Sequence, residues 1–300
     1  MIHFPNIREG QQGTMKDGIF ALIWYSGIPF CFREILQRKK RITIVLFHDI
    51  SPKNAEKIFG YLKKKYTIIG LQDLLDNYNA GTWNFPKKSL IITFDDGHVG
   101  NYALLPIIKK LDIPVTIFLC AGIIDTKRHF WFPPNHPEYT FSDLKRMENH
   151  TRLSVLKEIG FTPETEYDDV QALTKKEIEE MAPLVNFQSH SLFHPFLPRC
   201  TTEEAEKEIA GSKSLLEQEY GLTINAFSYP NGDYSPRDIE LCKKAGYSCA
   251  VSLIAGYNTP DTDLFQLKRV SVNDAESLYE LAVKASGFWG FFTNFTRKFL

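Results

Sequence analysis

The chain has 300 residues, of which 43% are hydrophobic and 24% charged, and its formal net charge is -1. That length allows one large α/β domain or two small ones, and the composition excludes a globally disordered chain. The balanced charge gives no reason to expect nucleic acid as a partner. The five cysteines are neither densely spaced nor paired in Cys-x-x-Cys motifs, so neither a disulfide framework nor a cysteine zinc site is expected.

The first 41 residues precede the predicted domain and contain an apolar stretch. Residues 18–32 carry no charge over 15 positions, which is short for a membrane span. As a signal peptide the stretch would begin late, and it lacks a small-x-small cleavage site. We expect a buried helix or a peripheral contact with a membrane surface. The location of the protein, cytoplasmic, membrane-associated or extracytoplasmic, stays open.

From residue 42 onward, short apolar runs alternate with helical patterns. Strands are predicted at residues 42–47, 89–94, 114–120, 184–189, 224–229, 247–252 and 266–272. Helices are predicted at residues 53–65, 102–111, 201–220 and 236–245, and a further helix begins at Thr174. Such alternation indicates βαβ units and a parallel sheet, either open or closed. Because no G-x-G-x-x-G follows the first strand, we expect a distorted or incomplete (β/α) barrel of about seven parallel strands.

Two segments depart from this rhythm, one inside and one after the predicted domain of residues 42–285. Residues 125–171 are too long for an ordinary connection and predict an inserted lid or subdomain. Trp131 in this insert could stack on a sugar ring or belong to the core of the insert. In the tail, residues 286–300, four phenylalanines fall on one helical face: Phe288, Phe292, Phe295 and Phe299. That pattern is typical of an amphipathic helix on a membrane surface, and also of a helix that closes the bottom of a barrel.

Polar motifs follow four of the predicted strands: His48-Asp49, Asp95-Asp96-Gly97, the run from His190 to Pro195, and Pro230-Asn231-Gly232. In a parallel α/β barrel the carboxyl ends of all strands open onto one face, where catalytic residues collect. His190 and His194 are four residues apart and can reach one metal ion. Two histidines with one carboxylate are typical of a catalytic metal site. One aspartate can then bind the metal while the other acts as general base toward a water molecule whose pKa the metal lowers.

At these residues the sequence resembles the polysaccharide deacetylase family, the carbohydrate esterases with a NodB-type domain. Residues 93–97, Thr-Phe-Asp-Asp-Gly, are similar to the first motif of that family, and residues 190–195, His-Ser-x-x-His-Pro, to the second. The resemblance spans roughly residues 42 to 285 and implies a distorted (β/α) barrel. It also implies that Asp95 is the general base and that Asp96, His190 and His194 bind a divalent metal, most often zinc.

The third motif of the family differs in this chain. Many members have Arg-Pro-Pro-Tyr-Gly, whereas this chain has Ser-Tyr-Pro-Asn-Gly at residues 228–232. The Arg that usually braces the base is therefore missing from this motif. The resemblance implies that the backbone N–H of Asn231, beside Tyr229 and Pro230, stabilises the oxyanion, since any residue supplies that N–H.

The general acid also differs from the usual pattern. Many members carry a late Leu-x-His motif whose His is the acid, but the matching stretch here, which begins at Leu267, reads Leu-Lys-Arg. The first predicted strand and the residue after it read Val-Leu-Phe-His at 45–48. This strand end resembles that of the family branch that de-N-acetylates poly-N-acetylglucosamine, in which the acid comes from the first strand. We therefore expect His48 to be the general acid, with a purely structural His48 as the alternative.

Taken as a whole, the sequence predicts a metal-dependent hydrolase that removes N-acetyl or O-acetyl groups from a polysaccharide or glycan, acting as a monomer. Two alternatives remain at this point. The same fold and metal could hydrolyse another C–N bond, such as that of a small cyclic amide. The chain could instead be a non-catalytic carbohydrate-binding homologue, because the usual Arg and the Leu-x-His motif are absent.

Overall fold

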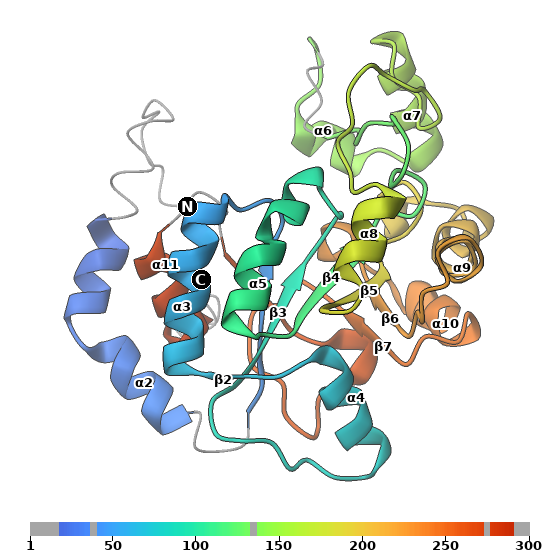
Figure 1. Cartoon of the computed structure of the whole chain (residues 1–300). Coiled ribbons are helices and arrows are strands. Elements are labelled where there is room, and N and C mark those ends of the chain that lie inside the picture. Colours follow the sequence, from blue (N-terminus) through green and yellow to red (C-terminus); the bar gives the residue numbers. More distant parts are fainter. Residues whose placement is uncertain (1–17, 37–40, 133–136, 273–276, 291–300) are drawn as a thin grey trace.

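The computed structural model describes residues 18–36, 41–132, 137–272 and 277–290. Its centre is one sheet in which the strands pair in parallel (Figure 1). Seven strands follow one another in the order β7-β6-β5-β4-β3-β1-β8, and β2 pairs with β3 outside this path. The strands are β1 (Thr43–Phe47), β2 (Thr67–Ile68), β3 (Ser89–Phe94), β4 (Val115–Leu119), β5 (Val185–Ser189), β6 (Ala226–Ser228), β7 (Cys249–Val251) and β8 (Val270–Ser271).

The sheet curls until one short segment joins its two edges. Before β8, the Leu267 N–H donates to the Ala250 carbonyl at 3.0 Å, and the Leu267 carbonyl accepts from the Ser252 N–H at 2.8 Å. The same segment then pairs with β1 through Val270 and Ser271. The predicted incomplete (β/α) barrel is therefore confirmed.

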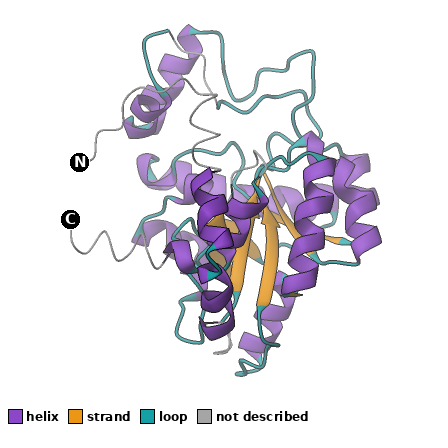
Figure 2. Ribbon diagram, turned by 90° about the vertical axis from the view of Figure 1, so that its left-hand side faces the viewer, coloured by secondary structure: helices purple, strands orange, loops and turns teal. Residues whose placement is uncertain are grey.

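Helices enclose the strands, as the side view in Figure 2 shows. They are α2 (Ile28–Leu36), α3 (Pro52–Lys65), α4 (Leu71–Asn79), α5 (Leu105–Leu111), α6 (Phe141–Arg146), α7 (Asn149–Glu158), α8 (Lys175–Met181), α9 (Thr202–Tyr220), α10 (Pro236–Lys244) and α11 (Leu278–Ala285). Thr174 and Thr201 begin α8 and α9 with the capping boxes expected from the sequence, each hydroxyl accepting from the N–H of a glutamate three residues on.

Alternate residues of the strands pack on opposite faces of the sheet. Ile44 and its β3 neighbour Ile91 belong to an inner cluster, whereas the next pair, Val45 and Ile92, packs in the outer cluster with α3. Burial on both faces explains the continuous apolar runs of these parallel strands. The inner cluster also contains Leu74 of α4, and α4 lies at the lower end of the barrel (Figure 1). An element that was not predicted thus closes the bottom of the barrel.

The segment between β4 and α8 contains α6 and α7, which stand out from the barrel (Figure 1, upper right). It has a small core of its own, formed by Trp131, Leu144, Val155 and Leu156 with Phe196 from the barrel. This cluster lies beside the loop that follows β5. The insert is therefore tied to the carboxyl ends of the strands.

The N-terminal segment packs against the outside of the barrel. Residues 18–25 are helical and continue, after a turn, into α2, and both helices run along α3 and α11 (Figure 1, dark blue). The Phe288 ring contacts that of Phe32 at a centroid distance of 5.2 Å. The other three tail phenylalanines, within residues 291–300, lie outside the described residues. No helix in the described ranges is long and apolar enough to cross a membrane.

Candidate active site

The Asp-Asp-Gly motif forms a tight turn at the carboxyl end of β3. The Asp95 N–H continues the ladder to the Phe47 carbonyl of β1 at 3.0 Å, and the chain then turns through positive φ at Asp96 and Gly97. Aspartate tolerates this left-handed conformation better than most residues. Gly97 is required, because a Cβ atom there would lie 2.6 Å from the Leu119 side chain. The turn directs the two adjacent carboxylates toward different partners.

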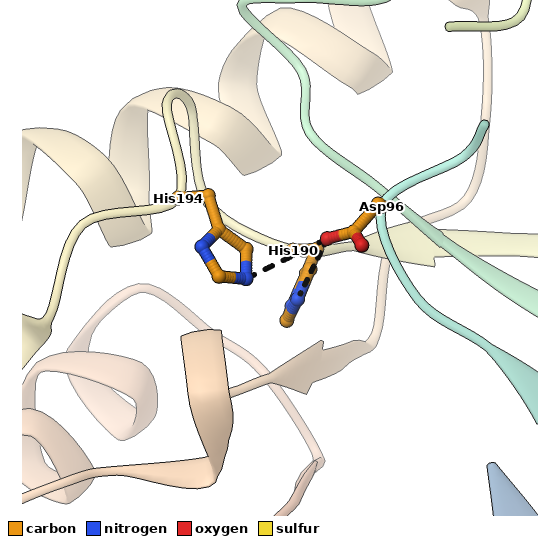
Figure 3. Close-up of side chains that lie close together, drawn as sticks. All are labelled: Asp96, His190 and His194. Atoms are coloured by element: carbon orange, nitrogen blue, oxygen red, sulfur yellow. Dashed lines mark ion pairs between the residues drawn. The ribbon is translucent and has the colours of Figure 1, made fainter. Parts of the chain in front are cut away.

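Asp96 lies in one cluster with His190 and His194, and all three side chains are buried (Figure 3). The Asp96 Oδ1 atom is 3.5 Å from Nε2 of each histidine, and one ligand atom from each residue lies within 4.8 Å of the others. His190 Nδ1 lies 2.7 Å from the Ser228 carbonyl. Since a carbonyl only accepts, Nδ1 carries the proton and the Nε2 lone pair faces the cluster. Two imidazole nitrogens and one carboxylate fit a divalent cation such as zinc.

A histidine that the sequence analysis did not single out supports Asp96. His98 Nε2 lies 3.2 Å from Asp96 Oδ2, whereas Oδ1 is the oxygen that lies near His190 and His194. Burial raises the pKa of Asp96, but the hydrogen bond with His98 and the nearby imidazoles of His194 and His190 lower it more, so the pKa lies well below its ordinary value. His98 orients the carboxylate, as outer partners of metal ligands commonly do. Its only sequence signal is its position two residues after Asp96.

Asp95 is braced by an arginine that the sequence analysis overlooked. Arg269 donates from Nη1 to Asp95 Oδ1 and from Nη2 to Asp95 Oδ2, both at 2.7 Å, and its side chain is fully buried. The Ser228 hydroxyl also donates to Asp95 Oδ2, at 3.1 Å. The expectation that the base lacks an arginine brace is therefore wrong. Ser228 occupies the third-motif position, and the guanidinium comes from the segment that leads into β8.

The Arg269 pair sets the charge of Asp95. Burial raises the pKa of Asp95, but the Arg269 guanidinium opposes this, with smaller contributions from His190 and His48, and the pKa falls below its ordinary value. Asp95 is therefore ionised at neutral pH. Its Oδ2 atom is 3.7 Å from His190 Nε2, which places a charged carboxylate beside the Asp96–His190–His194 cluster.

The loop that carries His194 is held at several points. Both Ser191 and His194 have positive φ, at 68° and 55°, a conformation that is unfavourable for residues other than glycine. The His194 N–H donates to the Ser191 hydroxyl at 3.0 Å, and the N–H groups of the two residues before His194 donate to the Glu208 carboxylate of α9 at 2.8 and 2.9 Å. The Trp131 indole N–H donates to the His194 carbonyl at 2.9 Å. His194 is thus fixed in its strained conformation from α9 and from the insert.

The remaining site residues lie around this centre. His48 follows β1, and its carbonyl accepts from the Asn101 amide at 2.8 Å, while its imidazole is close enough to Asp95 to affect its pKa. Asn231 follows β6 at a φ of 57°. It lines a cavity of about 820 Å³ together with Arg269. Four further predicted substrate residues have buried side chains, and their contact with substrate stays a prediction: Trp131, Tyr229, Pro230 and Leu267.

The Trp131 side chain is buried in contacts with residues of the insert. Its side chain is only 5% exposed, stacks on Phe141 at a centroid distance of 5.7 Å, and has the Arg152 guanidinium 4.8 Å from its ring. The ring is therefore enclosed by the insert itself. The sequence left open whether Trp131 stacks on a sugar ring or belongs to the core of the insert. In the structure its ring packs in the core of the insert.

A sequence model of one family, described as polysaccharide deacetylase, matches residues 83–250 of the chain. The chain belongs to the polysaccharide deacetylase family. This membership confirms the family resemblance and the predicted enzyme class. The chain is 28% identical over 203 residues to the poly-beta-1,6-N-acetyl-D-glucosamine N-deacetylase of Staphylococcus epidermidis. This alignment covers 64% of this chain and 57% of that protein.

Solved structures give the same fold. The Streptococcus pyogenes deacetylase PplD, in complex with acetate, superposes with a TM-score of 0.61 at 20% identity and covers 82% of this chain and 98% of that one. IcaB from Ammonifex degensii superposes with a TM-score of 0.61 at 19% identity, and the match covers 82% of this chain and 97% of that one. At these identities the similarity shows the fold, a distorted (β/α) barrel of NodB type.

Proposed function

We propose that this polysaccharide deacetylase is a metal-dependent hydrolase that removes N-acetyl groups from a glycan of N-acetylglucosamine units. One observation carries the proposal: a buried, ionised Asp95 lies directly beside a buried cluster of two histidines and one aspartate. The N-deacetylase from Staphylococcus epidermidis supports the choice of substrate class. We propose zinc as the metal, because nitrogen and oxygen ligands that leave positions open are typical of catalytic zinc sites.

Each residue near the cluster has a proposed role. A divalent ion held by Asp96, His190 and His194 would lower the pKa of a water molecule and polarise the acetyl carbonyl. Asp95 accepts the proton of the attacking water, and the fork of Arg269 keeps its carboxylate in one orientation. The backbone N–H of Asn231 stabilises the oxyanion.

The proton for the departing nitrogen comes from His48 in this proposal. Two observations support this role: His48 directly follows β1, as Asp95 follows the neighbouring β3, and its imidazole helps to lower the pKa of Asp95. An amine is a poor leaving group unless it is protonated as the C–N bond breaks. Asp95 and His48 therefore begin the reaction in opposite protonation states.

The non-catalytic alternative loses its main argument in this structure. It depended on the absence of the bracing arginine and of the Leu-x-His motif, and Arg269 supplies the first of these to Asp95 from the segment that leads into β8. The cyclic-amide alternative concerns only the substrate. It is tested by acetate release from β-1,6- and β-1,4-linked N-acetylglucosamine oligomers and from an O-acetylated sugar, with ring opening of a cyclic amide measured in parallel.

We expect release from an N-acetylated oligomer, and none from that oligomer with Asp95→Asn. Preferred hydrolysis of the cyclic amide would contradict the proposal. We also propose that the chain acts as a monomer in peripheral contact with a membrane. Light scattering of the purified protein measures its molar mass and so tests whether it is a monomer.

A further inference from the structure

Side-chain exposure around the Asp96–His190–His194 cluster indicates from which side a substrate enters. The side chains of Asp96 and His190 are 2% and 1% exposed. Those of His194 and His98 are 11% and 23% exposed, and these two imidazoles therefore border the side that is open to solvent. A glycan whose acetyl group is to reach the cluster has to approach along this side.

Three consecutive aromatic residues of the insert, Phe130, Trp131 and Phe132, lie along the same side. The Phe130 ring packs against the His98 imidazole at a centroid distance of 4.8 Å. The Phe132 ring packs against the His194 imidazole at 4.5 Å, and the Trp131 N–H is bonded to the His194 carbonyl. The segment is thus attached to both histidines that border the opening.

Phe132 is the ring of the three that remains partly accessible. Phe130 and Trp131 are 7% and 5% exposed, whereas Phe132 is half-buried. The Trp131 ring contacts Phe132 edge to face at 5.6 Å, and the Phe130 ring contacts it at 5.5 Å. Phe132 also packs against both the core of the barrel and the core of the insert. Its place beside His194 is therefore fixed from both sides.

We propose that Phe132 stacks on a sugar ring of the glycan when an N-acetyl group of that glycan lies at the cluster. The inference rests on the proposed deacetylation and adds a residue that binds the substrate. Because the Phe132 and His194 rings are in contact, a sugar whose acetyl group reaches the cluster past His194 comes within reach of Phe132. One face of a pyranose ring presents C–H groups, and a flat aromatic ring is an apolar surface that such a face covers well. The more deeply buried Trp131 holds Phe132 in place in this arrangement.

The test compares KM and kcat for acetate release from a β-1,6-linked N-acetylglucosamine tetramer by the zinc-loaded protein. Phe132→Leu keeps an apolar side chain against His194 but lacks a flat ring. It should raise KM about five- to tenfold and change kcat less than about twofold, because a stacking contact present in both the ground state and the transition state affects binding alone. Phe132→Tyr keeps the flat ring and should retain the KM of the unmodified protein. Zinc affinity, measured by calorimetry, should be the same in all three proteins.

Phe141→Leu is the matched control. Phe141 belongs to the same insert and is 44% exposed, but it stacks on Trp131 and contacts Phe196 instead of His194, so this variant should retain the unmodified KM. An unchanged KM for Phe132→Leu would overturn the inference. So would a loss of zinc affinity in that variant that accounts for its lower activity, because Phe132 would then only position His194.

A binding measurement separates this inference from the proposed function. Calorimetry of the tetramer with zinc-loaded Asp95→Asn, which should not turn over, measures binding alone, and adding Phe132→Leu should weaken that binding about five- to tenfold. Weaker binding in the double variant, together with no acetate release by the unmodified protein, would refute the deacetylation and support the sugar contact. Equal binding by the two proteins would overturn the contact, whether or not acetate is released.

Discussion

Replacing Arg269 by methionine should lower the free energy of unfolding, because the buried Asp95 carboxylate then lacks its counterion. Asp95 is 3% exposed and Arg269 is fully buried, and two parallel hydrogen bonds of 2.7 Å join them. Methionine retains much of the side-chain volume but offers no donor, so Asp95 keeps the hydrogen bond from the Ser228 hydroxyl and loses its guanidinium partner. Breaking a buried pair in this way costs about 3–5 kcal/mol. We expect a loss of that size in the free energy of unfolding of the metal-free protein at neutral pH.

The loss should depend on pH in a defined direction. In the unmodified protein the pKa of Asp95 lies below its unfolded value, so the pair adds stability above the unfolded pKa and loses it as the pH falls through the folded pKa. In Arg269→Met, burial without the guanidinium raises the pKa of Asp95 above its unfolded value. The variant is then least affected in acid and becomes progressively less stable as the pH rises. The difference between the two proteins should therefore widen from about pH 4 toward neutrality.

Urea unfolding at several pH values measures these differences, and a double variant isolates their cause. Adding Asp95→Asn to Arg269→Met replaces the unpaired charge with a neutral amide, so the double variant should recover at least about 1.5 kcal/mol at neutral pH. A double variant no more stable than Arg269→Met would refute the reasoning. So would a loss of stability that is equal at pH 4 and pH 7.

Three further predictions concern the metal and the proton transfers. Asp96→Ala should abolish zinc binding and activity together, whereas Asp95→Asn should keep the zinc, measured by metal analysis, and lose turnover. His48→Ala should lower kcat about 100- to 10,000-fold in an acetate-release assay, and near-normal turnover would exclude it as the acid. Trp131→Phe removes the N–H bond to the His194 carbonyl but keeps the aromatic packing. Calorimetry should show zinc affinity about tenfold weaker, while an unchanged affinity would leave Trp131 with a packing role only.

Sequence patterns predicted those strands and helix starts that depend on residues close together in the chain. β1, β3 and β4 read as uncharged, mainly apolar runs because every residue in them is buried. α8 and α9 begin where Thr-x-x-Glu places a capping box. The four residues proposed as metal ligands and base could be brought together for a similar reason, since parallel strands have their carboxyl ends at one face, while their separate roles came from the family resemblance. No knowledge of the tertiary contacts was needed for these predictions.

The parts that sequence reasoning missed depend on closure of the barrel. Arg269 and Asp95 are 174 positions apart, and they meet only because the segment before β8 bonds to β7 while β8 pairs with β1. The signal in the sequence was an arginine inside the predicted strand of residues 266–272, because an arginine buried there requires an ion-pair partner. α4 was missed because its N-cap residue is Gly70, which has no side chain to mark the start of a helix.

The most direct test of the central claim is a zinc titration of the metal-free protein, followed by acetate release from a β-1,6-linked N-acetylglucosamine oligomer. The account predicts that acetate release rises in proportion to bound zinc and levels off at one equivalent per chain. It also predicts that Asp96→Ala shows neither binding nor release. Release at an undiminished rate from protein kept free of metal by a chelator would contradict the account. Full occupancy of zinc with no acetate from any acetylated sugar would do so as well.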